Sequence, residues 1–334
     1  MEQVQRRPWR RWVVLVLIIL GIFLGGRFIP IQPEITVAPE KLIEEPIWDN
    51  FLGFAGPFYL FNTIPTMIGT LIILGVIIYF TNRSLKRSAQ TDLVPRGIGN
   101  FVEGILEILY NLTESSAGAK YARMIFPWFA TIMIYVLFAN LLKLIPGFET
   151  IGVLHHAHGE GHEIAPLFGN FSVLTPTIVE DGYILAPFVR GISVDLNFTF
   201  SLALIAVVMI QVIGFRAQGF AYFSKFWNTR RMFKVPFFGA MDFLVGLIEL
   251  ISEVSKILSF AFRLFGNMFA GVVLLAVVAT MLGGVLGRFP IIPAMLYLFE
   301  LFVGVIQAFV FGMLTMVFMA QATQGHGEEH AEAH

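Results

Sequence analysis

The feature that most constrains this sequence is a set of long apolar segments. A helix that crosses the hydrocarbon core of a bilayer needs about 20 predominantly apolar residues. Six regions meet or approach that length, over residues 12–28, 62–80, 124–145, 196–215, 239–287 and 291–320. Charged residues make up 13% of the chain, against about 25% in soluble domains. The sequence therefore predicts an all-α integral membrane protein with about five core helices and an additional N-terminal span.

The first apolar region, 12–28, permits two interpretations. A basic start followed by an apolar stretch is typical of a cleavable signal peptide, but no small-residue cleavage site follows. A retained signal anchor is the favoured interpretation, so residues 1–49 are expected to form this span and an outer segment. Residues 50–323 are expected to form the membrane domain, and residues 324–334 a His- and Glu-rich cytoplasmic tail.

Lysine and arginine are distributed unevenly between the two sides of these spans. Fifteen of the 22 basic residues fall on the side of the N-terminus, five on the opposite side and two inside region 239–287. Because basic residues are enriched in cytoplasmic loops, both termini are predicted to be cytoplasmic. The acidic segment 34–49 and the loop 146–195 then face outward. An amphipathic helix over 101–112 is predicted to lie in the membrane interface.

Region 239–287 carries the most informative polar residues. About 49 helical residues would measure about 74 Å, more than twice the roughly 30 Å hydrocarbon core. This region therefore either turns back inside the membrane or crosses it at a steep tilt. Polar residues recur in it every three or four positions, which places them in one stripe along a helix. They are Glu249, Ser252, Lys256, Ser259, Arg263 and Asn267.

Arg263 lies inside the membrane by this assignment, since 24 uncharged residues follow it. An arginine near the bilayer centre costs from about 3 to more than 10 kcal/mol, and its guanidinium does not lose its proton to relieve that cost. Arg263 therefore requires an anionic partner or an aqueous cavity. A functional charge is the favoured interpretation, and a buried structural ion pair is the alternative.

Glu300 is the only charged residue in region 291–320, and it shares a helix face with Gln307. An ionisable residue in such a span is a candidate proton relay. The alternative is a carboxyl that burial keeps neutral, or one that pairs with Arg263 for structure.

Four motifs narrow the interpretation further. Residues 259–271 read S-F-A-F-R-L-F-G-N-M-F-A-G, and Glu300 is followed by V-G-V-I-Q-A-F-V-F-G-M-L-T over 303–315. Residues 194–203 read V-D-L-N-F-T-F-S-L-A, and 140–147 read N-L-L-K-L-I-P-G. In sequence, order and spacing these motifs resemble subunit a of F-type ATP synthases, and the resemblance covers about residues 50 to 323.

The resemblance implies proton translocation through the Fo sector of a rotary ATP synthase, in the plasma (inner) membrane of a bacterium. A ring of c subunits would rotate against a long, steeply tilted hairpin formed by regions 239–287 and 291–320. Arg263 would keep the passing ring carboxylate ionised and prevent a direct proton leak between two offset half-channels. Further expected partners are b-type peripheral-stalk subunits, other ATP synthase subunits, lipid and protons, with no nucleic acid, cofactor or metal.

The resemblance also assigns polar residues to the two half-channels. Asn140, Asn267, Glu300 and Gln307 match positions near the outer half-channel, and Glu249, Ser252 and Ser259 match positions along the cytoplasmic exit. No phosphate-binding loop of the form G-x-x-x-x-G-K-[ST] is present. The chain is therefore expected to be non-catalytic, with the ATP chemistry in other subunits.

Three positions depart from the family pattern. Val272 stands where many members carry an acid or a histidine, and Glu300 stands where some have histidine. Lys143 replaces an acidic residue that relatives often place there. The ionisable group of the outer half-channel is therefore expected in the last span alone.

Other readings of the chain remain open. A sodium-driven version of the same subunit is one, because ion choice would lie mainly in the partner ring. An unrelated secondary transporter or ion channel is another, although no internal repeat supports it. A structural anchor does not explain the polar stripe.

Histidines cluster in the outer loop and in the tail. Such clusters can bind transition metals, but a solvated or proton-collecting loop and a frayed chain end are favoured. The residues are His155, His156, His158, His162, His326, His330 and His334.

Overall fold

The computed structural model describes most of the chain outside its two ends. The described residues are 38–43, 45–49, 57–88, 97–145, 149, 151–157, 159–168, 171–226, 236–282 and 291–324, together with Val16. Apart from Val16, the expected first span at 12–28 lies outside the described residues, as does the tail from 325 onward. The domain boundaries at residues 49 and 323 stay predictions.

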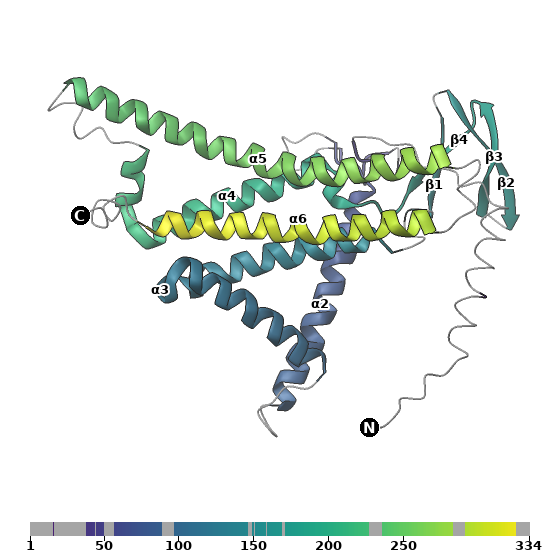
Figure 1. Cartoon of the computed structure of the whole chain (residues 1–334). Helices are drawn as coiled ribbons and strands as arrows, with labels where there is room; N and C mark the ends of the chain where they lie inside the picture. The colour runs from purple at the N-terminus through teal and green to yellow at the C-terminus, as the bar shows by residue number, and fades with distance from the viewer. Residues whose placement is uncertain are drawn as a thin grey trace. The chain divides into compact units, whose positions relative to one another are not determined.

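Five described helices are long and apolar enough to cross a membrane, which confirms the all-α membrane class. They are α2 (Thr63–Ser88), α3 (Ile98–Leu142), α4 (Leu196–Gln218), α5 (Pro236–Leu282) and α6 (Ile291–Thr323) (Figure 1). Two short 3₁₀ helices, η3 (Ile192–Val194) and η4 (Gly219–Lys225), flank α4.

Helix α3 consists of two straight parts joined at Gly118. The φ of 74° and ψ of 157° at Gly118 are not helical, and a positive φ favours glycine because it has no Cβ. Figure 1 shows the resulting sharp change of direction. The part before the bend contains the predicted helix over 101–112, and apolar side chains such as Phe101 and Ile108 are exposed on it. This part has the character of an interfacial helix.

Helix α5 is continuous over 47 residues, a length of about 70 Å. The described part of region 239–287 therefore does not turn back on itself. This length is more than twice the roughly 30 Å hydrocarbon core, and a steep tilt of α5 in the membrane stays a prediction.

The chain divides into two compact units. The first, called the helical unit, comprises residues 63–143, 190–268 and 304–334. The second, called the sheet unit, comprises residues 1–62, 144–189 and 269–303.

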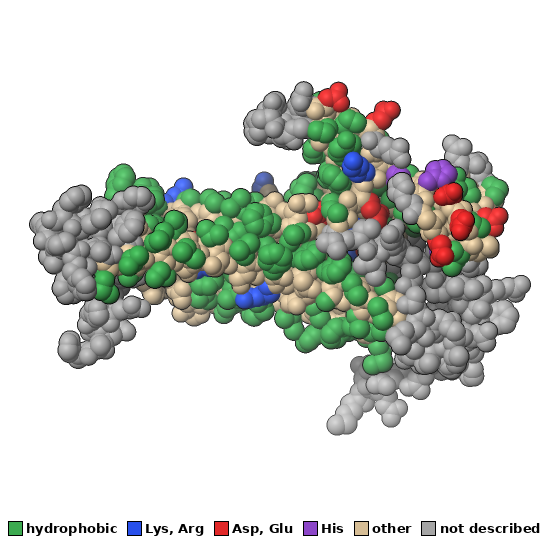
Figure 2. All heavy atoms as spheres, turned by 90° about the horizontal axis from the view of Figure 1, so that it is seen from above, with side chains coloured by type: hydrophobic (Ala, Val, Ile, Leu, Met, Phe, Trp, Pro, Cys, Tyr) green, Lys and Arg blue, Asp and Glu red, His purple; other side chains and the backbone are tan. Residues whose placement is uncertain are grey.

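The core of the helical unit joins α3, α4, α5 and α6. Its fully buried large side chains include Ile125, Phe129, Val136, Ile210, Ile213, Leu264, Met316 and Met319. Apolar residues also cover the outside: Ile72 and Ile78 of α2 are 61% and 64% exposed, and Ile248 of α5 is 65% exposed. Figure 2 shows this apolar surface over the helices. An outside as apolar as the inside is expected where lipid replaces water as the solvent.

The sheet unit contains four antiparallel strands that the sequence did not predict, since the segment was expected to be a loop. They are β1 (Gly152–His156), β2 (Glu160–Phe168), β3 (Phe171–Glu180) and β4 (Tyr183–Pro187), in the spatial order β1-β4-β2-β3. Gly161 and Gly182 face each other closely: a Cβ added to Gly161 would lie 2.5 Å from the carbonyl carbon of Gly182. The sheet therefore depends on glycine at this crossing.

The outer histidines are part of this sheet. His156 of β1 and His162 of β2 both pair in register with Tyr183 of β4, and the rings of His156 and Tyr183 lie 4.3 Å apart. No group of three or more His, Asp or Glu side chains suited to a metal is found among the described residues. His158 and the tail histidines lie outside them.

Close contact between α3 and α6 requires Gly312. A Cβ added there would lie 2.8 Å from Cβ and 2.9 Å from Cγ of Met133. We predict that Gly312→Ala separates the helices and lowers the stability of the purified protein in detergent by about 1–3 kcal/mol, which a lower melting temperature would show.

A matched control is Gly75→Ala in α2, where nothing lies within 4 Å of an added Cβ. Alanine in an open helical position is stabilising by about 0.5–1 kcal/mol, so this variant should melt at or above the wild-type temperature. Equal melting temperatures for the two variants would contradict the packing argument.

Candidate functional site

The polar stripe of α5 lies along the edge of its exposed face. Arg263 and Asn267 are exposed, whereas Leu264 and Met268, their neighbours in sequence, are 1% exposed. The remaining members follow the same pattern: Ser252 and Ser259 are exposed, and Glu249 and Lys256 are half-buried. The structure thus confirms the stripe as one continuous feature of a single helix.

Aromatic packing sets the rotation of α5 about its own axis. The ring of Phe260, which is 2% exposed, lies 5.3 Å from that of Phe311 and 5.8 Å from that of Phe318, both on α6. Arg263 comes three residues later, about 60° around the helix. With Phe260 packed against α6, the Arg263 guanidinium is directed away from the core.

The Arg263 guanidinium makes no ion pair or hydrogen bond among the described residues of the helical unit. The alternative of a structural ion pair therefore gains no support within this unit. A permanent charge on an apolar helix, exposed and free to accept a partner, suits an interaction with a carboxylate outside the chain.

Within the sheet unit, Glu300 lies against the last part of α5. It is 7% exposed, and a Cβ added to Gly271 would be 3.6 Å from Oε1 of its carboxyl. A side chain at Gly271 would thus be in ordinary van der Waals contact with this carboxyl. By contrast, nothing lies within 4 Å of a Cβ added to Gly266, so neither glycine is required here by a close approach.

A buried polar cluster centres on Asn140, near the end of α3. The side-chain nitrogen of Asn140 donates to the carbonyl oxygen of Gly304 in α6 at 3.0 Å. The hydroxyl of Ser193 in η3 donates to the amide oxygen of Asn140. Both side chains are at most 1% exposed, so an amide, a hydroxyl and a carbonyl form a buried polar cluster that joins α3, η3 and α6. Gln307, half-buried, follows Gly304 by three residues in α6.

Two further buried residues, Asp195 and Lys143, lie close in sequence to Ser193 and Asn140. Asp195 caps α4: one carboxylate oxygen accepts from the backbone N–H of Asn197 at 2.9 Å, and the other accepts from the hydroxyl of Thr63 at 3.2 Å. Lys143 is 6% exposed, and its Cδ would be 2.8 Å from a Cβ added to Gly191. The start of α4 is therefore fixed by a cap, by α2 and by the end of α3.

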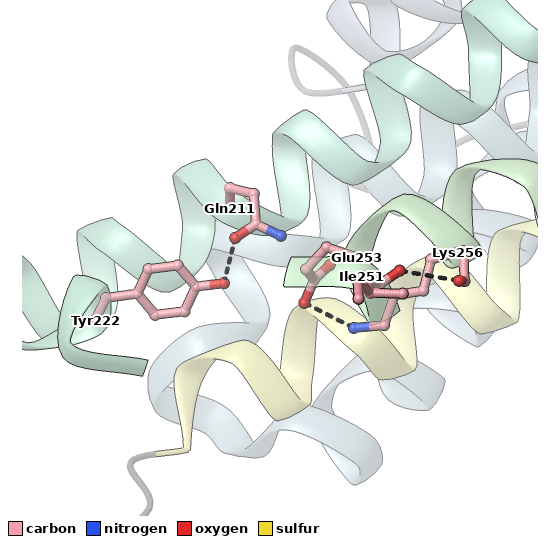
Figure 3. Close-up of polar contacts among 6 residues, drawn as sticks. Gln211, Tyr222, Ile251, Glu253 and Lys256 are labelled. Carbon is pink, nitrogen blue, oxygen red and sulfur yellow. Dashed lines mark hydrogen bonds and ion pairs between the residues drawn. The ribbon is translucent and has the colours of Figure 1, made fainter. Parts of the chain in front are cut away.

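A second polar group lies among η4, α4 and α5 (Figure 3). The hydroxyl of Tyr222 donates to the amide oxygen of Gln211 at 2.7 Å, and Lys256 Nζ lies 2.9 Å from Glu253 Oε1. Gly214 admits the Tyr222 ring, whose Cε2 would be 2.4 Å from an added Cβ. Glu253, Tyr222 and Gln211 were not among the residues predicted from the sequence.

The polar contacts found for the predicted residue Asn140 are with Gly304 and Ser193, neither of which was predicted as a site residue. No sequence pattern indicated Ser193 as a partner of Asn140. Glu253 could have been found, because it precedes Lys256 by three residues and such pairs meet on a helix surface.

Fold and site together define a multi-pass membrane protein with an exposed arginine on one of its long apolar helices. Comparisons with known proteins make this specific. Residues 65–320 match the family described as ATP synthase A chain. ATP synthase subunit a of Helicobacter pylori strain P12 is 29% identical over 264 residues, which are 76% of this chain and 89% of the relative. The subunit a of Desulforamulus reducens is 31% identical over 270 residues, which are 79% of this chain and 81% of the relative.

The chain therefore belongs to the ATP synthase A chain family. It is a non-catalytic membrane subunit of the Fo sector and takes part in ion translocation there.

The Asn140 cluster gives a test of the site. We predict that Asn140→Ala lowers proton pumping, because it leaves the Ser193 hydroxyl and the Gly304 carbonyl buried without this partner, at a cost of about 1–3 kcal/mol. ATP-driven quenching of a pH-sensitive dye in inverted vesicles measures the effect. Asn111→Ala, at an exposed position of α3, is the control. Equal pumping by the two variants would contradict a role for the cluster.

Proposed function

We propose that this chain carries protons across the plasma (inner) membrane of a bacterium by way of two offset half-channels and a rotating ring of c subunits. The observation that carries the proposal is Arg263: a permanent cation on a long apolar helix, exposed and without a partner among the described residues of the helical unit. An isolated charge at such a position is costly. A mobile carboxylate on a neighbouring subunit would offset that cost each time it passed.

Arginine suits this role for two physical reasons. Its guanidinium stays protonated when desolvated, whereas a lysine ammonium can lose its proton. Its planar donors also match the two oxygens of a carboxylate. A ring carboxylate beside Arg263 would thus be held ionised until it moved on and took up a proton. The fixed cation would repel a proton passing directly between the half-channels.

Polar groups along the path support the assignment of the two half-channels. On the outer side we assign Asn140, Asn267, Glu300 and Gln307, to which the geometry of the Asn140 cluster adds Ser193. On the cytoplasmic side we assign Glu249, Ser252 and Ser259. Amide and hydroxyl groups both donate and accept hydrogen bonds, so they can support chains of water that conduct protons.

The chain associates with other ATP synthase subunits. We propose the c-ring and b-type peripheral-stalk subunits as its direct partners, with both termini in the cytoplasm. The exposed face of α5 that carries Arg263 is the surface proposed to meet the ring.

Replacement of Arg263 tests the proposal. In the assembled complex, Arg263→Ala is expected to abolish ATP-driven proton pumping in inverted vesicles, because no fixed cation then acts on the ring carboxylate. The matched control is Arg216→Ala, which removes an exposed arginine at the end of α4 and should pump like the wild type. Pumping near the wild-type level by an assembled Arg263→Ala complex would refute the proposal.

The same vesicles decide which ion is carried. Proton transport predicts dye quenching in sodium-free medium that a protonophore abolishes at once. ATP-driven uptake of radioactive sodium that resists the protonophore, with no dye quenching, would instead establish the sodium-driven version.

A further inference from the structure

Lys256 is the second cation on the stripe of α5. It precedes Arg263 by seven residues, which corresponds to about 20° around the helix and about 10 Å along it. Both side chains therefore project from nearly the same side of α5. A carboxylate attracted to one of these cations would be attracted to the other, unless one of them is already neutralised.

Lys256 is neutralised within the helical unit. Its ammonium lies 2.9 Å from the carboxylate of Glu253, with the two side chains 20% and 8% exposed. On its other side it lies 4.7 Å from the centre of the Phe318 ring on α6, in the geometry of a cation–π contact. The pair is thus held against the α5–α6 interface, while Arg263 is exposed.

The position of Glu253 on the helix explains how the pair is buried. It lies about 60° around the helix from Lys256, on the side of the core residues Phe260 and Leu264. It is also close enough to Tyr222 to interact with it electrostatically, and Figure 3 shows the pair beside the Tyr222–Gln211 hydrogen bond. The carboxylate therefore draws the Lys256 ammonium toward the core and away from the exposed face.

We propose that Glu253 is a positioning residue that masks the charge of Lys256, so that Arg263 is the one uncompensated cation that α5 offers to the ring. The inference rests on the proposed function and deepens it. Charges in a medium of low dielectric interact over long distances because neither water nor salt screens them. An unmasked Lys256 would give a passing carboxylate a second binding position about 10 Å from the first, and so hinder its step past Arg263.

A role of Glu253 in proton transfer would make a different prediction from its role in masking Lys256. If Glu253 instead passed protons along the cytoplasmic exit, its carboxyl would be needed whatever residue stands at position 256. Replacement of Glu253 alone does not separate the two roles, whereas its replacement together with Lys256 does.

The experiment compares Glu253→Gln with the double variant Glu253→Gln/Lys256→Gln. Glutamine keeps the size of the side chain and removes only the charge. We expect Glu253→Gln to lower ATP-driven proton pumping at least about fivefold, because the half-buried ammonium of Lys256 then keeps an uncompensated charge that attracts a passing carboxylate. The double variant should return pumping to within about twofold of the wild type, because the α5 charge balance is restored. Glu103→Gln, at an exposed position of α3, is the control for loss of one carboxylate and should pump normally.

Assembly of each complex is checked on native gels, and Arg263→Ala is measured in parallel. Wild-type pumping by Glu253→Gln, or a double variant as impaired as the single one, overturns the masking role. If Glu253→Gln does not assemble, the double variant decides alone: pumping supports masking, and an assembled complex that does not pump overturns it. If Arg263→Ala still pumps, the proposed function fails, which is a separate outcome from failure of this inference.

Discussion

The contact of Phe260 with Phe311 and Phe318 determines how α5 presents its polar stripe. A helix in lipid has no hydrophobic driving force toward its neighbours, so its rotation is set by shape and by a few polar contacts. The ring of Phe260 on α5 packs against the rings of Phe311 and Phe318 on α6. The ion pair of Glu253 and Lys256 adds a polar contact, with Lys256 about one turn and Glu253 about two turns before Phe260. Arg263 is exposed as a consequence of these inward contacts.

Small residues and buried polar groups hold the remaining helices in the same way. Gly312 lets α6 approach α3, and Gly214 lets the Tyr222 ring approach α4. At these close contacts, hydrogen bonds such as that of Asn140 to the Gly304 carbonyl are formed inside the unit. A polar group that water would satisfy in a soluble protein has to find its partner within the bundle here. Buried polar groups thus stabilise the helical unit by pairing with one another.

The sequence predicted the five core helices and the single stripe on α5, because apolar length and helical spacing are properties of the chain itself. It did not predict the four-stranded sheet, since strand pairing such as His156 with Tyr183 joins residues far apart in sequence. Nor did it indicate Ser193 as the partner of Asn140, a contact that spans 53 positions. The sequence also left open whether region 239–287 turns back on itself, and in the structure residues 236–282 form one unbroken helix.

Because α5 is continuous, substitutions and changes of length in this helix have different effects. Every position on an unbroken helix is tied to the next by 100° of rotation and 1.5 Å of rise. Replacing an apolar residue between Phe260 and Arg263 changes one contact, but inserting or deleting a single residue there would turn Arg263 by about 100°, into the core or out of reach of its partner. The spacing along this helix is therefore under a stricter constraint than its composition, and mutational scanning should tolerate substitutions in places where it rejects every change of length.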